Sequence, residues 1–254
     1  MHCGIRFTTL SGFVLLSLSA CQPAFTPEPP PEPQSIGVTP LYLGWVSDSL
    51  SSYRASHQEV NFQLDTYPLT SGQHAVEAGE IDLYIGVIDP GPSLFATPLI
   101  QDGIAVAHHP ELDLRNLTLG ELRQIFSGSV HNWQSFGGPD LEIQPVIPLP
   151  GDDLRLTFQQ RVMGDFQFST LARLQSAPGQ TIDLIENEPG AVGLIPLSLL
   201  DGDVVVFRIE GQSPSSRTIA NGDYPLTYWV TAVALQEPDG PARDWLAWVQ
   251  ASNN

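Results

Sequence analysis

Short apolar runs of strand length alternate with amphipathic helical stretches along most of the chain. Strand-like segments lie at residues 61–64, 81–85, 143–147, 191–195, 204–209 and 228–235, and helical spacing of apolar residues marks 41–53, the stretch from 154 to 162, and 241–249. Such alternation is typical of domains in which helices cover a sheet. The sequence therefore predicts an α/β fold.

One helix start is marked by side chains that can cap it. Thr118 and Glu121 have the spacing of a capping box, in which each side chain bonds a backbone N–H of the other residue. Leu122, Ile125 and Phe126 follow with the spacing of one buried helix face. We expect a helix over residues 118–126.

The N-terminal residues have the pattern of a secretory signal peptide. Arg6 precedes an apolar run from Phe13 to Leu18, which is too short to cross a bilayer. The run ends in Leu18-Ser19-Ala20-Cys21, which resembles the bacterial lipobox, whose cysteine is lipidated. Residues 1–21 are thus predicted to be a signal peptide, and Cys21 to anchor the protein outside the cytoplasm on the bacterial cell membrane. An ordinary signal peptide with an incidental cysteine is the alternative.

Residues 22–35 are predicted to be an extended tether. Six prolines fall within residues 22–34, and proline-rich segments favour an extended helix without internal hydrogen bonds. The chain has two cysteines, Cys3 and Cys21, so the predicted folded domain, residues 36–254, has no thiol and no disulfide.

The charge of the chain narrows the range of partners. The chain has 28 acidic and 10 basic residues, which gives a formal net charge of −18. A nucleic-acid backbone would be repelled by such a surface, so nucleic-acid binding is not expected.

Several motifs occur in the order found in one transport family. The stretch from Leu117 to Trp133, which includes Ile125-Phe126-Ser127-Gly128, resembles a conserved segment of the phosphate-binding proteins of bacterial phosphate ABC importers. Weaker matches are Gly79–Leu83, Asp102–Val106, Pro189–Gly193 and Tyr224–Leu226. Together they cover about residues 36 to 250, and their shared order carries the resemblance.

The resemblance implies a two-lobed periplasmic-binding-protein type 2 fold with a ligand cleft between the lobes. Lobe one would comprise residues 36–102 and 197–250, and lobe two residues 103–196. The protein would be a solute-binding protein that delivers a small-molecule ligand to an ABC permease. It would not be an enzyme, and it would need no cofactor.

The predicted ligand site departs from the family pattern. The family has an arginine followed by a Gly-Ser-Gly-Thr turn at a helix start, where free N–H groups can hold an anion. Here Pro148 replaces the arginine, and the turn reads Gly151-Asp152-Asp153-Leu154, followed by Arg155. In lobe one, two family turns appear in altered form, and the polar residues that they offer the ligand are Thr39, Thr70, Ser71 and Gly72.

The two aspartates have two interpretations that remain open at this point. Asp152 and Asp153 are either ligand groups or caps that complement the helix dipole. Both interpretations disfavour phosphate, because a carboxylate about 4 Å from a phosphate is repelled by about 4 kcal/mol at an effective dielectric constant near 20. A neutral hydroxylated or a cationic ligand therefore fits the sequence better than an oxyanion.

The sequence also leaves a function other than transport open. A non-transporting interaction or sensory lipoprotein that kept the fold and lost the site is the alternative function. His108-His109 is expected at a loop or edge and not at a metal, because neighbouring residues on a strand point to opposite faces. The sequence lacks the Gly-x-Ser-x-Gly elbow of α/β hydrolases. Trp133 is expected in the core.

Overall fold

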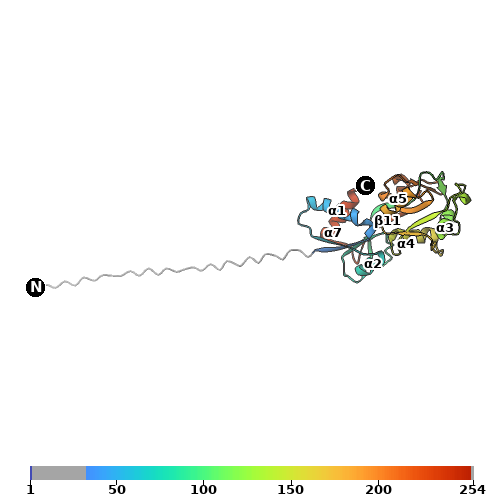
Figure 1. Cartoon of the computed structure of the whole chain (residues 1–254). Coiled ribbons are helices and arrows are strands. Elements are labelled where there is room, and N and C mark those ends of the chain that lie inside the picture. Colours follow the sequence, from blue (N-terminus) through green and yellow to red (C-terminus); the bar gives the residue numbers. More distant parts are fainter. Residues whose placement is uncertain (2–32, 253–254) are drawn as a thin grey trace. The chain divides into compact units, whose positions relative to one another are not determined.

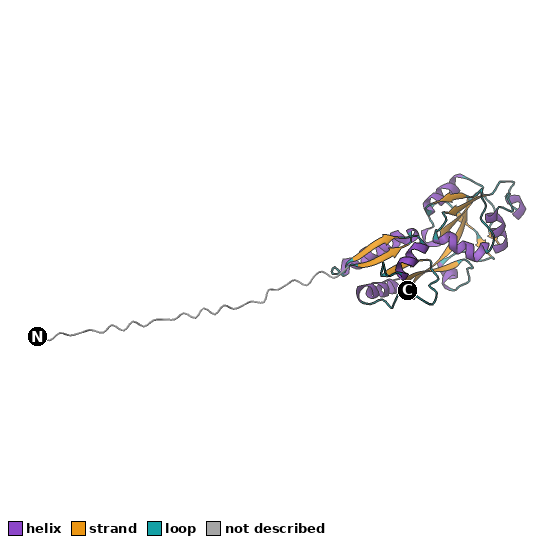
Figure 2. Cartoon of the chain, turned by 90° about the horizontal axis from the view of Figure 1, so that it is seen from below, coloured by secondary structure: helices purple, strands orange, loops and turns teal. Residues whose placement is uncertain are grey.

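The computed structural model describes Met1 and residues 33–252 (Figure 1). The predicted signal peptide, Cys21 and most of the predicted tether lie outside the described residues, so these predictions stay untested. Residues 33–252 form one compact unit, in which helices flank a curled sheet (Figure 2). The mixture of helices and strands confirms the predicted α/β class.

The first half of the sheet joins five strands around a parallel core. In spatial order they are β2 (Phe62–Thr66), β1 (Gln34–Val38), β3 (Leu83–Gly86), β11 (Thr227–Ala234) and β4 (Phe95–His108). β1 pairs in parallel with both β2 and β3, whereas β11 runs antiparallel to β3 and to residues 95–103 of β4. We call these strands the first sheet half.

The second sheet half begins where β4 changes its partner. Residues 104–108 of β4 pair with β8, which is followed in order by β6 and β7, while β9 pairs with the end of β4. The bounds are β8 (Ala191–Pro196), β6 (Gln144–Pro148), β7 (Arg173–Gln175) and β9 (Val205–Val206). A separate two-stranded sheet pairs β5 (Asn116–Leu117) with β10 (Arg208–Ile209). The long strand β4 therefore belongs to both halves.

Seven α-helices surround these strands in the part of the chain that the structure describes. They are α1 (Leu43–Ser56), α2 (Leu69–Glu77), α3 (Leu119–Ser127), α4 (Asp153–Phe158), α5 (Pro178–Asn187), α6 (Ser216–Ala220) and α7 (Gly240–Ser252). Short 3-10 turns cover Pro40–Tyr42, Trp133–Phe136 and Leu197–Leu199, and a π-helical turn, Gln159–Met163, extends α4. Within the described residues, every helix is too short or too polar to cross a membrane.

The helix predicted over residues 118–126 is confirmed as α3. Thr118 accepts a hydrogen bond from the Glu121 N–H over 3.2 Å, and Glu121 accepts one from the Thr118 N–H over 2.7 Å. Gly128 closes the helix with a φ of 70°, a left-handed conformation that glycine adopts without strain. Local capping therefore fixes both ends of α3.

Trp133 lies in the core, as expected. Its side chain is fully buried, its indole Nε1 donates to the Gly190 carbonyl over 3.1 Å, and its ring packs against Phe136 and Phe207. A buried indole that also satisfies its one donor is a strong packing element. Trp133 thus links α3's end to the second sheet half.

Some features of the local structure were missed or predicted wrongly. β1 and β4 were not predicted, and the strand expected at 204–209 is split into β9 and β10. Thr70-Ser71-Gly72, which was predicted as a turn, lies in the first turn of α2. His108 was expected at a loop or edge. It is a buried residue at the end of β4, and it pairs with Val192 of β8 on one side and with Val205 of β9 on the other. The missed strands and His108 depend on long-range strand pairing, which the local pattern does not reveal.

Candidate functional site

The candidate site lies where β1, β3 and α4 come together. β1 and β3 are parallel neighbours, so their carboxyl ends lie side by side, and the Thr39 N–H donates to the Ile85 carbonyl over 2.9 Å. α4 approaches from the second sheet half, directly after β6. Ligands of open α/β sheets bind at such carboxyl ends. The position therefore suits a binding site.

Asp152 caps α4. Its side chain accepts a hydrogen bond from the Leu154 N–H over 2.8 Å, and Gly151 makes the preceding turn with a φ of 87°. Burial raises the pKa of Asp152, although its bonds to the helix N–H groups counteract the shift. One of the free N–H groups at the helix start is thus taken by the protein itself.

Asp153 reaches across to the first sheet half. It is 1% exposed, and its Oδ2 accepts a hydrogen bond from the Val87 N–H over 2.8 Å. Its Oδ1 is buried without a hydrogen-bond partner. Burial raises the pKa of Asp153 to about 7, although the Val87 N–H and the Thr39 hydroxyl favour the ionised form. The Asp153 carboxyl group is therefore expected to titrate near neutral pH.

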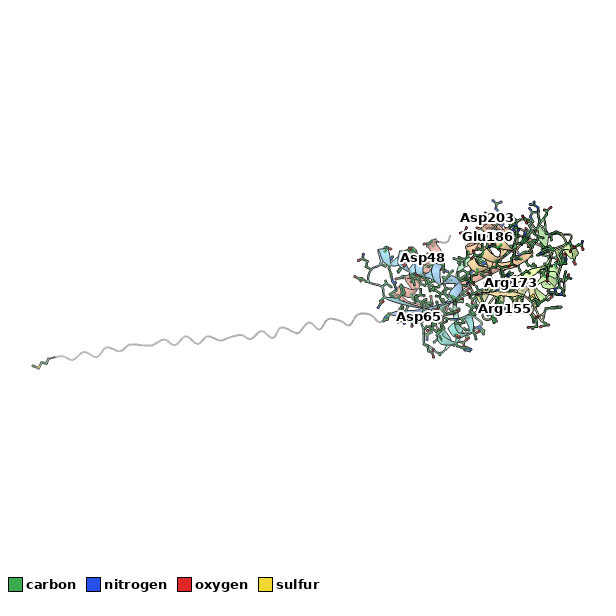
Figure 3. All side chains as sticks on the ribbon, viewed as in Figure 1. Asp48, Asp65, Arg155, Arg173, Glu186 and Asp203 are labelled. Atoms are coloured by element: carbon green, nitrogen blue, oxygen red, sulfur yellow. The ribbon has the colours of Figure 1, made fainter. Side chains whose placement is uncertain are left out.

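Arg155 lies on α4 (Figure 3), and its side chain is held within the second sheet half. Its guanidinium donates to the Pro148 carbonyl over 3.0 Å and lies 4.7 Å from the centre of the Phe168 ring. Burial lowers its pKa, while the charge of Asp152 acts in the opposite direction. The guanidinium is thus engaged by a carbonyl and an aromatic face of its own half of the sheet.

The predicted residues on α2 divide into two groups. Thr70 and Ser71 are exposed, whereas Gly72 is buried against the ring of Tyr84. A Cβ at Gly72 would lie 2.0 Å from a Tyr84 ring carbon, so only glycine lets the helix pass this close. Tyr84 in turn lies beside Asp153, since a Cβ at Gly86 would be 3.0 Å from Asp153 Oδ2 and 3.2 Å from the Tyr84 hydroxyl. Gly72 therefore shapes the site through Tyr84.

Sequence reasoning missed the partner of Asp153. The Val87 N–H belongs to the backbone, and it lies 66 residues away in the chain. No side-chain pattern signals such a donor, and only the end of β3 brings it to the site.

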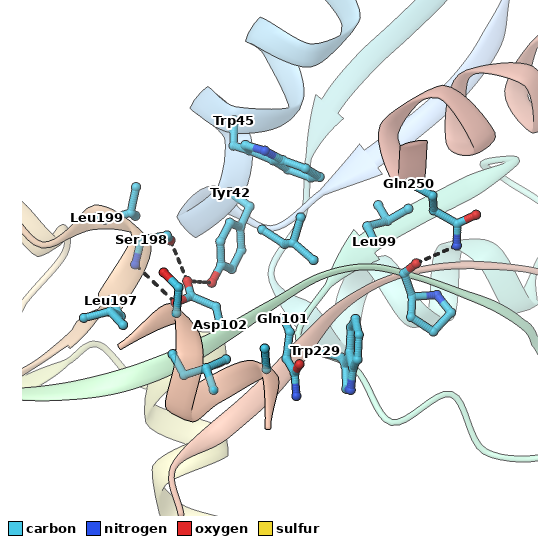
Figure 4. Close-up of a pocket in the computed structure, with 15 residues that line it drawn as sticks. Tyr42, Trp45, Leu99, Gln101, Asp102, Leu197, Ser198, Leu199, Trp229 and Gln250 are labelled. Carbon is cyan, nitrogen blue, oxygen red and sulfur yellow. Dashed lines mark hydrogen bonds between the residues drawn. The ribbon is translucent and has the colours of Figure 1, made fainter. Parts of the chain in front are cut away.

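A hollow of about 930 Å³ lies elsewhere, beside the point where β4 changes partners (Figure 4). None of the predicted ligand residues lines it; Trp45, Trp229 and Asp102 do. Asp102 is buried and accepts hydrogen bonds from the Tyr42 hydroxyl over 2.9 Å and from the Ser198 hydroxyl and N–H over 2.5 and 3.1 Å. Because its oxygens are already used, Asp102 offers this hollow little binding capacity.

The described residues contain no cluster of three or more His, Cys, Asp or Glu side chains that could hold a metal ion.

The comparisons with known proteins bear on what the site does. A family model described as a PBP superfamily domain matches residues 36–253. The chain belongs to this superfamily.

Two curated relatives are phosphate-binding proteins. The phosphate-binding protein PstS of Bacillus subtilis (strain 168) is 26% identical over 152 residues, which cover 59% of this chain and 50% of the relative. The PstS of Borreliella burgdorferi is 22% identical over 141 residues, 51% of this chain and 50% of that protein. The chain thus spans about half the length of the curated relatives that it matches.

Solved structures share the fold over nearly the whole domain. An ABC-type phosphate transport receptor from Vibrio cholerae superposes with a TM-score of 0.77 at 21% identity, covering 85% of this chain and 93% of the receptor. This likeness confirms the two-lobed periplasmic-binding-protein fold. The protein therefore resembles the phosphate-binding component of ABC importers, and its relatives are binding proteins, not enzymes.

Proposed function

We propose that the protein is an extracytoplasmic solute-binding protein of an ABC importer and that its ligand is not phosphate. The observation that carries this proposal is the use of the site's donors by the protein's own carboxylates. Asp152 occupies the Leu154 N–H at the start of α4, and Asp153 occupies the Val87 N–H at the end of β3. An incoming oxyanion would find these donors taken and two carboxylates beside it.

The remaining chemistry of the site favours a ligand that donates hydrogen bonds. Asp153 Oδ1 is a buried acceptor without a partner, and the Thr39 side chain is buried next to it. A ligand hydroxyl would satisfy this oxygen in both protonation states of the carboxyl group, and a ligand ammonium group would satisfy it in the ionised state. We therefore infer a neutral hydroxylated or a cationic solute, which Thr39, Asp152 and Asp153 would contact.

The proposal includes the lobe division expected from the family resemblance. Lobe one comprises residues 36–102 and 197–250, and lobe two residues 103–196, so that the ligand lies between Thr39 on one side and Asp153 on the other. Within residues 197–250, β9 and β10 extend to lobe two, because they pair with β4 and β5. Arg155 would support the turn at Pro148 and not the ligand.

Calorimetry with inorganic phosphate tests the ligand proposal. We expect no phosphate binding tighter than millimolar by the intact chain at pH 7. The double variant Asp152→Ser with Asp153→Gly removes both carboxylates and should recover weak anion binding. Asp48→Ser with Asp65→Ser is the matched control, since it removes two exposed carboxylates far from Arg155 (Figure 3) and should bind no phosphate.

The outcomes of this titration separate the functions. Micromolar phosphate binding by the unaltered protein would overturn the proposed ligand class. A screen that finds an amine or polyol, whose binding the double variant loses, supports transport of that solute. If neither the unaltered protein nor the double variant binds phosphate, amines or polyols, the result would favour the non-transporting interaction or sensory lipoprotein.

The anchoring part of the proposal needs a separate test. We propose that lipid on Cys21 holds the protein at the outer face of the bacterial cell membrane, where an ABC permease is its partner. Stable anchoring takes more than one acyl chain, so the modification should be multiple. Cys21→Ser should move the protein from the membrane fraction to the soluble extracytoplasmic fraction. Unchanged membrane retention would reject the lipid anchor.

A further inference from the structure

We propose that Asp153 is an internal ligand that latches the two sheet halves together through the Val87 N–H, and that its carboxyl group has to release this N–H before it can bind a solute. This inference rests on the proposed function, because it concerns the same site. It adds a competition between a group of the protein and the solute, and it makes that competition depend on pH.

The geometry of Asp153 is that of a ligand and not of a helix cap. Its neighbour Asp152 already caps α4, through the Leu154 N–H of the same helix. Asp153 instead bonds the Val87 N–H of the first sheet half, although its own helix belongs to the second. The hydrogen bond therefore crosses from one half to the other, and separating the halves at this point breaks it.

The first sheet half provides a cradle for this carboxyl group. Gly86 leaves the room for Oδ2, because a Cβ there would lie only 3.0 Å from that oxygen. Tyr84 forms one wall, and it is held in place by a hydrogen bond from its hydroxyl to the Tyr67 carbonyl, 3.2 Å long. Gly72 allows α2 to close over the Tyr84 ring. The cradle is thus built from backbone and from residues without competing charge.

The cradle holds the neutral carboxyl better than the ionised one. Burial is the main cause that raises the pKa of Asp153 to about 7, and the nearby charge of Asp152 acts in the same direction. The other titratable groups that face it are Tyr84 and Tyr228, whose pKa values burial raises, so both stay neutral at physiological pH. Arg155 does not compensate the charge, since it bonds the Pro148 carbonyl.

The direction of the pH effect follows from these pKa values. In the open form, a solvated Asp153 has a pKa of about 3.9. Because the latched pKa is higher, the latch is fully stabilised below about pH 4 and weakens as pH rises towards 7. One proton is released on opening, so the open population should rise about tenfold per pH unit between pH 5 and 7 and level off above pH 7.

Amide hydrogen exchange at Val87 tests the latch in the intact chain. The Val87 N–H is protected only while it bonds Asp153, so its protection factor, corrected for the intrinsic exchange rate, reports the latched population. We expect this factor to fall by about tenfold per pH unit from pH 5 to 7. The Asp153→Asn variant keeps an acceptor oxygen without a charge, and its protection should be independent of pH.

The Asp152→Asn variant is the matched control. It removes a charge from the adjacent residue and keeps an N-cap that is as good as aspartate, so the pH slope at Val87 should persist. A flat profile in the unaltered protein, or a slope that survives in the Asp153→Asn variant, would overturn the latch. Circular dichroism of each variant shows that it is folded.

The latch and the proposed ligand class can fail separately. If the pH slope is absent and phosphate still does not bind, the latch is wrong and the ligand class stands. If the slope is present and the unaltered protein binds phosphate at micromolar concentrations, the ligand class is wrong and the latch stands. The two measurements therefore test different statements about one carboxyl group.

Discussion

Two buried aspartates of this protein lie close to the boundary between the sheet halves, and they are held in opposite ways. Asp102 on β4 accepts hydrogen bonds from Tyr42, from Ser198 and from the Gly103 N–H, so both of its oxygens have partners (Figure 4). Asp153 on α4 has one strong partner, the Val87 N–H, and one oxygen without any.

The difference shows how the same side chain can serve the fold or a binding site. A buried carboxylate whose oxygens are all satisfied stabilises its surroundings, and removing it leaves several donors unpaired. A buried carboxyl with an unused oxygen and a raised pKa is typical of functional positions. The comparison therefore assigns Asp102 to the fold and Asp153 to the site, and three experiments test this assignment.

The largest expected effect is the loss of Asp102. Asp102→Ala leaves the hydroxyl groups of Tyr42 and Ser198 and two backbone N–H groups without their acceptor, which should cost about 3 kcal/mol or more in free energy of unfolding. Asp153→Ala at pH 8 should cost far less, because it also removes a charge from a buried position. Urea unfolding of both variants measures the difference. Equal losses would contradict the assignment.

A second variant uses the pH dependence of stability. The folded pKa of Asp153, about 7, exceeds its unfolded value, so its contribution to stability is greatest below about pH 4 and is lost as pH rises through 7. The unaltered protein should therefore lose stability relative to the Asp153→Asn variant by about 4 kcal/mol between pH 4 and 8. Urea midpoints across this range give the result. A constant difference between the two proteins would show that Asp153 titrates alike in both states.

The smallest expected effect comes from the cradle. Gly86→Ala places a methyl group 3.0 Å from Asp153 Oδ2, so the carboxyl group or Tyr84 has to move, at a cost of about 1 kcal/mol. Gly44→Ala on α1 is the control, because no atom lies within 4 Å of its Cβ position and alanine favours the helix. Thermal unfolding should show opposite signs for the two changes. A gain of stability in Gly86→Ala would mean that the cradle is loose.

Local sequence patterns predicted elements whose ends are fixed by nearby side chains. The capping box of Thr118 and Glu121 lies within one turn, and α3 forms as expected. β4 was missed because its sequence contains Pro98, Asp102 and Gly103, which are unfavourable in an isolated strand. Pairing with β11 on one stretch and β8 on the next stabilises it nonetheless.

The residues of the candidate site could be predicted from the sequence, but their hydrogen-bond partners could not. The sequence placed Asp152 and Asp153 at a helix start and left two roles open, cap and ligand group. The structure assigns Asp152 to the cap and gives Asp153 a bond across to Val87. That bond depends on how β3 and α4 meet, and no local pattern encodes this meeting.

The central claim is that the Asp153 carboxyl group lies buried between the two sheet halves. Its titration can be followed directly by NMR of ¹³C-labelled aspartate carboxyl groups in the intact protein, with the Asp153→Asn variant to assign the signal. The account predicts a midpoint near the pKa of about 7 that burial imposes. A midpoint of about 4, the value of a solvated aspartate, would contradict the burial of this carboxyl group.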